Sequence, residues 1–141
     1  MKDIKKYNLI LCMALLSGLT SCFEVYDEGY DLIGRVATIP VFTLSQNSVA
    51  PGGEVTANYR YYSEHEAVTE LRLIQIIGEE ATTVSTRQVT DHNLLNSYEG
   101  SFDYTAPEVD QSTVVTLRFE VQTANSLVNF RQAQLTVTGG E

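Results

Sequence analysis

Residues 115–122 read Val-Thr-Leu-Arg-Phe-Glu-Val-Gln, an unbroken alternation of apolar and polar side chains. Successive side chains of a strand point to opposite faces, so the four apolar residues share one face and the four polar residues share the other. A strand of this kind packs one face on a core and turns the other to water. The segment therefore predicts an antiparallel sheet with one buried face.

Strand patterns recur between residues 35 and 138, and no run of helical length has a period of 3.6. Proline and glycine separate them, because proline fixes φ and glycine accepts positive φ, as in Pro51-Gly52-Gly53 and at Gly78. Seven segments over about 100 residues predict an all-β fold, an immunoglobulin-like antiparallel β-sandwich. The expected strands are 36–44, 55–61, 73–77, 82–90, 98–104, 115–122 and 128–138.

The amino-terminal segment is typical of a secretion signal. Three lysines precede an apolar run from Leu9 to Leu19, which is shorter than the roughly 20 residues that cross a bilayer. Leu19-Thr20-Ser21-Cys22 follows, and this tetrapeptide resembles the lipobox of bacterial lipoproteins. The resemblance implies cleavage after residue 21 and lipidation of the Cys22 thiol, with stable anchoring by two or more acyl chains. The alternative is a simple cleaved signal with a chance cysteine.

Cleavage would change both the cysteine count and the charge. Cys12 leaves with the signal and Cys22 carries lipid, so no thiol remains for a disulfide, a zinc site or a nucleophile. The mature part keeps six arginines against 17 acidic residues, a formal net charge of −11. Because binding to phosphates needs clustered cations, we expect no nucleic-acid partner.

Residues 22–34 are short and acidic and carry glycine, so we expect a tether between Cys22 and a domain at 35–138, with a tail at 139–141. Surface lipoproteins of the Bacteroidetes type often carry acidic residues just after the lipidated cysteine. Glu24, Asp27 and Glu28 resemble that feature in part, which implies an outer-membrane anchor that faces outward. A plain solvated spacer is the alternative.

The turn at Pro51-Gly52-Gly53, the segment from Tyr98 to Pro107 and the segment from Val115 to Val137 together resemble a known family. They are similar to the single immunoglobulin-like (PKD- or cadherin-like) domains of Bacteroidetes-type outer-membrane lipoproteins. Those include small accessory lipoproteins of polysaccharide-uptake systems, which implies a binding role. The tryptophan and paired cysteines of antibody domains are missing.

A search for catalytic and metal-binding patterns predicts no enzyme, no metal site and no cofactor. Ser63-Glu64-His65-Glu66 would need a histidine at position 69 to form a zinc-binding HExxH motif, and Thr69 stands there. We expect His65 and His92 to be exposed loop residues. A calcium ion among the acids near Asp27, Asp31 or residues 64–70 stays open, although these acids lack a ligand rhythm.

Tyr61 and Tyr62 are the ligand-binding candidates. Neighbours on a strand point to opposite faces, and an exposed aromatic ring can stack on a sugar. The alternative is that tyrosines fill and cap the core. Residues 73–77 are apolar on both faces, so one face needs a cover, either a partner or the folded-back tether.

Two classes of function follow from these patterns. The first is a lipid-anchored, surface-exposed, non-catalytic binding or accessory module of an outer-membrane complex for uptake, for example of polysaccharide, or for adhesion. Its partner would be an envelope protein or a glycan. The second is a structural envelope protein or pilus-type subunit.

Overall fold

The computed structural model describes residues 36–139, which form eight strands. The signal segment, Cys22, the tether and its acidic residues lie outside the described residues. None of the described residues belongs to a helix that could cross a membrane. The strands are β1 (Thr38–Leu44), β2 (Ser48–Val49), β3 (Glu54–Tyr62), β4 (Val68–Ile77), β5 (Glu80–Gln88), β6 (Ser97–Thr105), β7 (Thr113–Thr123) and β8 (Val128–Val137).

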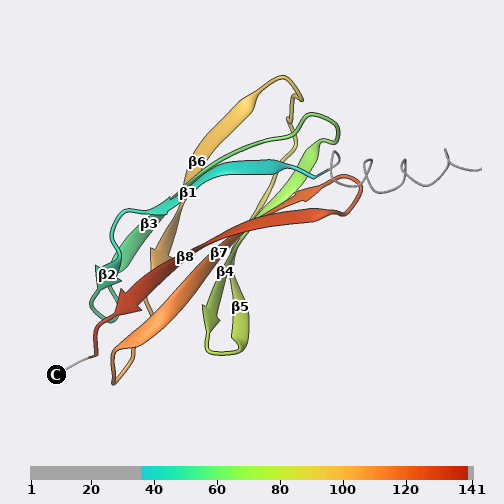
Figure 1. Cartoon of the computed structure of the whole chain (residues 1–141). Coiled ribbons are helices and arrows are strands. Elements are labelled where there is room, and N and C mark those ends of the chain that lie inside the picture. The colour runs from blue at the N-terminus through green and yellow to red at the C-terminus, as the bar shows by residue number, and fades with distance from the viewer. Residues whose placement is uncertain (1–35, 140–141) are drawn as a thin grey trace, which may run out of the picture. The chain divides into compact units, whose positions relative to one another are not determined.

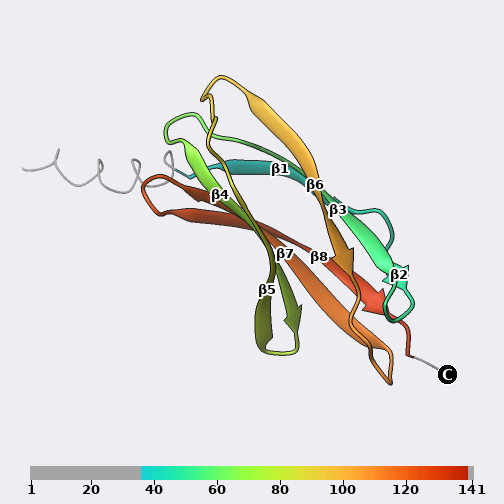
Figure 2. The same ribbon diagram turned by 180° about the vertical axis from the view of Figure 1, so that it is seen from behind.

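The strands form two sheets that pack face to face (Figures 1 and 2). One sheet has the order β1-β3-β6 and the other the order β2-β8-β7-β4-β5. Only β2 pairs in parallel, with the end of β8, and the other pairs are antiparallel. In chain order these sheets match strands A, B and E against strands C, C′, F and G of an immunoglobulin domain. The predicted immunoglobulin-like sandwich is confirmed, with one strand more.

The additional strand, β2, has two residues, Ser48 and Val49. A segment this short leaves no alternation in the sequence, so the prediction missed it. The expected strand 73–77 is the second half of β4, which begins at Val68. The expected strand 82–90 is β5, displaced by two residues. The turn glycines are as predicted, with φ of +70° at Gly52 and +61° at Gly78.

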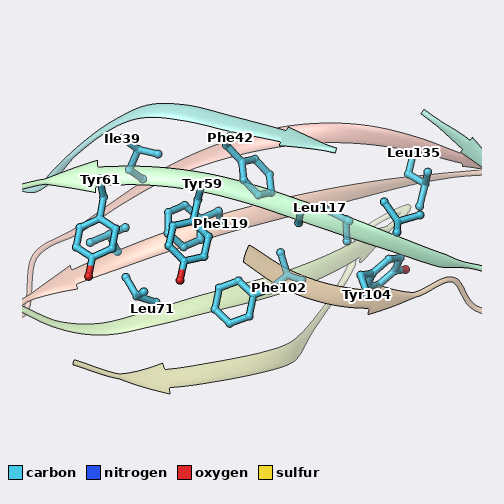
Figure 3. Close-up of a cluster of buried hydrophobic side chains, with 14 of the residues drawn as sticks. Ile39, Phe42, Tyr59, Tyr61, Leu71, Phe102, Tyr104, Leu117, Phe119 and Leu135 are labelled. Atoms are coloured by element: carbon cyan, nitrogen blue, oxygen red, sulfur yellow. The ribbon is translucent and has the colours of Figure 1, made fainter. Parts of the chain in front are cut away.

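The core lies between the sheets, and aromatic rings join them at its centre (Figure 3). The Tyr59 ring on β3 stacks on the Phe119 ring on β7, with 4.4 Å between centroids. The Phe42 ring on β1 also stacks on Phe119, with 5.7 Å between centroids. In antibody domains the equivalent strands are linked by a disulfide. Here stacked rings link β3 to β7. The predicted inner face of β7 is fully buried: Val115, Leu117, Phe119 and Val121.

Gly100 on β6 lies opposite Tyr59 on β3. A Cβ atom at this glycine would come within 2.5 Å of the Tyr59 hydroxyl oxygen and 2.8 Å of its Cζ atom. The tyrosine ring therefore extends over Gly100, and a larger residue would displace it. Because Gly100 has no side chain, the Tyr59 hydroxyl can extend past this position toward β5.

β5 is the edge strand of the larger sheet and is exposed on both faces for almost its whole length. Among the described strands it pairs only with β4. The β4–β5 hairpin extends beyond the body of the sandwich (Figure 1). The two outward isoleucines of β4, Ile74 and Ile76, are half-buried by side chains in register on β7 and β5.

The two ends of the sandwich carry different loops. Thr38 pairs with Tyr62, and Tyr62 pairs with Ser97 on its other side. The start of β1 therefore lies at the same end as the loops 63–67, 89–96 and 124–127. We call this the Thr38 end. The turns 50–53, 78–79 and 106–112 lie at the opposite end, the Val137 end.

Candidate binding groove on the three-stranded sheet

The outer face of β3 and β6 carries a row of polar and aromatic side chains. Because Tyr59 and Tyr61 point into the core, the residues between and after them, Arg60 and Tyr62, point outward, as does Asn58. The register of β6 sets Ser101 opposite Asn58, Glu99 opposite Arg60 and Ser97 opposite Tyr62. The outer face thus carries both hydrogen-bond donors and acceptors.

A groove of about 390 Å³ lies on this face. One wall comes from β1, where a bulge between Thr38 and Val41 brings Val41 opposite Arg60. Concave surfaces with a few convergent polar groups are the usual form of ligand sites. The groove is lined by Val41, Asn58, Tyr59, Arg60, Glu99, Gly100 and Ser101.

Arg60 and Glu99 form an ion pair across the groove wall. Their side chains are 48% and 64% exposed, so water screens the pair and its contribution to stability is small, about 0.2–1 kcal/mol. Both groups can therefore exchange their mutual contact for a ligand at low cost. The guanidinium offers several donors and the carboxylate offers acceptors, a combination that suits hydroxyl-rich ligands.

The two candidate tyrosines are separated by the sheet. Tyr62 is half-buried and lies on the outer face, two residue pairs from Arg60 and Glu99. Tyr61 is 4% exposed, stacks on Tyr98 with 5.4 Å between centroids, and has a pKa raised to about 12 by burial. The Tyr61 ring is therefore packed in the core and is not exposed for stacking on a sugar. Tyr62 remains the candidate for stacking on a ligand.

The two histidines also differ. His65 is exposed in the loop 63–67, as expected. His92 is not fully exposed, because its ring packs at 5.0 Å from Tyr98 and 6.1 Å from Tyr61. Among the described residues neither ring nitrogen of His92 has a hydrogen-bond partner, and burial lowers the pKa of the imidazole. His92 thus caps the core at the Thr38 end.

Arg87 is a residue that the sequence did not single out. From the edge strand β5 its Nη1 donates to the Tyr59 hydroxyl at 2.6 Å and its Nη2 donates to the Ser101 carbonyl oxygen at 3.2 Å. Its guanidinium carbon lies 4.9 Å from the centroid of the Phe102 ring. Arg87 therefore ties the larger sheet to β6 and holds the strand that forms part of the groove.

The described residues contain no group of three or more His, Cys, Asp or Glu side chains arranged to hold a metal ion. Of the acids considered for calcium, Glu64 is exposed in the loop 63–67, and Asp27 and Asp31 lie outside the described part of the chain.

No protein-family model matches the sequence, and no curated protein matches it either. Solved structures are similar in fold. Spo0M, a sporulation control protein from Bacillus subtilis, has a TM-score of 0.52 and 14% identity over 74% of this chain and 50% of that chain. A superoxide reductase (neelaredoxin) from Ignicoccus hospitalis has a TM-score of 0.50 and 7% identity over 73% of this chain and 80% of that chain. Murine CRIg has a TM-score of 0.40 and 12% identity over 74% and 99%.

This chain spans half the length of the Spo0M chain. At such low identity the two structures that reach a TM-score of 0.5 show a shared β fold and nothing about ligand or reaction.

Proposed function

We propose that this protein is a lipid-anchored, non-catalytic binding module on the outer face of the outer membrane. It would serve as an accessory to a complex for uptake of a glycan, or for adhesion. The observation that carries the proposal is the groove on the three-stranded sheet. Its Arg60–Glu99 pair lies two residue pairs from Tyr62, whose half-buried ring is on the same outer face beside the groove.

A glycan matches this surface chemically. The apolar face of a sugar ring would stack on Tyr62, since such a face buries well against an aromatic ring. Its hydroxyl groups both donate and accept, so they would bond to the guanidinium of Arg60, the carboxylate of Glu99 and the amide of Asn58. The exposed ion pair would open for the ligand without leaving a buried charge unpaired.

Because the mature chain has a formal net charge of −11, the salt dependence of binding distinguishes a glycan from a protein partner. A protein partner would offer basic residues, and its association would weaken as salt rises because the charges are exposed. A neutral glycan held by stacking and hydrogen bonds would be nearly insensitive to salt. A pull-down from solubilised membranes at low and high salt, beside a polysaccharide array, distinguishes the two partners. Recovery of neither would contradict the proposal.

The anchor has a separate test. Cys22→Ala should abolish incorporation of labelled palmitate and release the protein from membranes, because the thioether needs the thiol. Labelling that persists in this variant would show that the lipid is attached at another residue.

One observation favours the alternative, a structural envelope or pilus-type subunit. Among the described strands β5 pairs on one side only, so the outward-facing main-chain groups along this nine-residue strand can pair with a strand of another chain. Sedimentation of the purified protein as ordered polymers, with no glycan or partner retained, would move the assignment to this class.

A further inference from the structure

Two leucines are exposed at one end of the sandwich. Leu95 is 93% exposed and its neighbour Leu94 is 39% exposed. Both lie in the loop 89–96 between β5 and β6, which belongs to the Thr38 end. Adjoining exposed apolar residues can mark contact with an apolar surface, whereas single scattered ones are normal on any protein.

The loop holds these leucines outward by its own hydrogen bonds. The Tyr98 hydroxyl accepts from the amide nitrogen of Asn93 at 2.6 Å and donates to the carbonyl oxygen of Asp91 at 3.3 Å. The Asn93 side chain accepts from the amide nitrogen of Leu95 at 2.9 Å. His92 packs on the Tyr98 ring beneath the tip. The loop is thus built to present Leu94 and Leu95 and cannot fold them back without breaking these bonds.

The chain outside the described residues enters at the same end. β1 begins at Thr38, which pairs with Tyr62, and Tyr62 pairs with Ser97 on its other side. Ser97 follows Leu95 by two residues. Residues 22–35 number 14, so even when fully extended they span at most about 50 Å. The Thr38 end is therefore the end nearest to Cys22 along the chain, and a lipid on Cys22 would hold it within about 50 Å of the bilayer.

We propose that Leu94 and Leu95 insert into the interface of the bilayer that carries the Cys22 lipid, so that the sandwich stands with its Thr38 end on the membrane. This rests on the lipid anchor of the proposed function. Insertion of one loop tip is weak by itself. It becomes effective because a short tether turns it into an intramolecular contact with an effective concentration on the order of millimolar.

The charges at this end select the kind of lipid surface. Glu64 and Asp91 are exposed in the neighbouring loops, so an anionic surface would repel this end at low salt. The contact fits a zwitterionic interface, into which a leucine side chain transfers favourably. With this end on the membrane, the groove faces sideways, parallel to the membrane, and the Val137 end points away from it.

The test uses the mature lipidated protein reconstituted in phosphatidylcholine vesicles. Because the one native cysteine of the mature chain carries the lipid, Leu95→Cys can be labelled selectively with an environment-sensitive fluorophore. Val114→Cys is the matched control, since Val114 is 54% exposed and lies at the Val137 end. We expect the probe at 95 to be quenched by brominated lipid several times more strongly than the probe at 114. Adding Leu94→Asp should reduce the quenching at 95.

Equal quenching at the two positions, whether weak or strong, would overturn the end-on contact. If the vesicles carry the protein but the probe at 95 reports water, the anchor holds and only this inference fails. If the protein does not float with the vesicles, the lipid anchor itself fails, and the inference with it. Stronger quenching in vesicles that contain anionic lipid would overturn the assignment to a zwitterionic surface.

Discussion

β7 and β5 lie in the same sheet on either side of β4, yet they are held in place by different forces. The inner face of β7 is completely buried, and its outer face is half-covered by a network in which Arg72 and Arg118 flank Glu120. β5 has no buried side chain at all. It is held by main-chain bonds to β4, by the β-propensity of its threonines, and by the reach of Arg87 to Tyr59.

The difference shows that alternation reports burial and not strand pairing. A central strand must alternate because one face meets the core. An edge strand that projects from the sandwich has no core to satisfy, so its sequence can be polar throughout and still pair. Burial energy is concentrated in β7, whereas β5 depends on main-chain pairing with β4 and on the contact of one long side chain, Arg87.

The largest expected effect is in β7. Phe119→Ala should cost about 3–5 kcal/mol and Leu117→Ala about 2–5 kcal/mol of the free energy of unfolding, because both side chains are fully buried. Val84→Ala in β5 should cost less than about 0.5 kcal/mol. Urea denaturation of the domain at 35–138, expressed without the anchor, measures all three.

Arg118→Ala sharpens the same comparison. Its guanidinium lies 4.7 Å from the Phe130 ring centroid and 3.5 Å from Glu120, so we expect a loss of about 1 kcal/mol, below that of either β7 core variant. Equal losses at positions 117 and 118 would contradict the inward–outward assignment of β7.

Arg87→Ala tests the attachment of β5. It removes two hydrogen bonds to β3 and β6, and we expect a loss of about 1–3 kcal/mol together with faster amide hydrogen exchange along β5. Thr86→Ala, one position away, should change stability by less than about 0.5 kcal/mol. If the two variants behave alike, the cross-sheet contact of Arg87 does not hold the edge strand.

The smallest effect is a pH dependence at His92. Burial lowers its native pKa below the usual 6.5, so between these two pKa values the unfolded chain binds more protons than the native protein. Stability should therefore fall as the pH drops through 6.5 and level off below the native pKa. His92→Gln should flatten this slope in denaturation curves, and His65→Gln, an exposed control, should leave it unchanged.

Much of the fold could be predicted because most strands meet the core on one face. The pattern from Val55 onward places Tyr61 inward and Tyr62 outward, and the structure agrees; naming Tyr61 as a ligand residue went against that alternation. His92 could not be placed, because its burial depends on Tyr61 and Tyr98, which only the register of β3 with β6 brings together.

The groove and Arg87 were beyond prediction for a related reason. The ion pair of Arg60 with Glu99 joins residues far apart in sequence, and a single sequence does not give strand register. The bond from Arg87 to Tyr59 crosses between sheets, and it needs the space that Gly100 leaves for the tyrosine ring. Local patterns contain neither fact.

The most direct test of the central proposal is calorimetric titration of the domain at 35–138, expressed without the anchor. The ligand is the glycan that binds this protein on the polysaccharide array. Tyr62→Ala should weaken binding by about fivefold or more, as expected when roughly 1 kcal/mol of ring stacking is lost. Phe130→Ala is the control, because this ring is also exposed but lies on the other sheet. Loss at Tyr62 with no change at Phe130, at low and high salt alike, is the result expected. Equal affinities for the wild type and Tyr62→Ala would contradict the proposal that the glycan stacks on Tyr62 beside the groove.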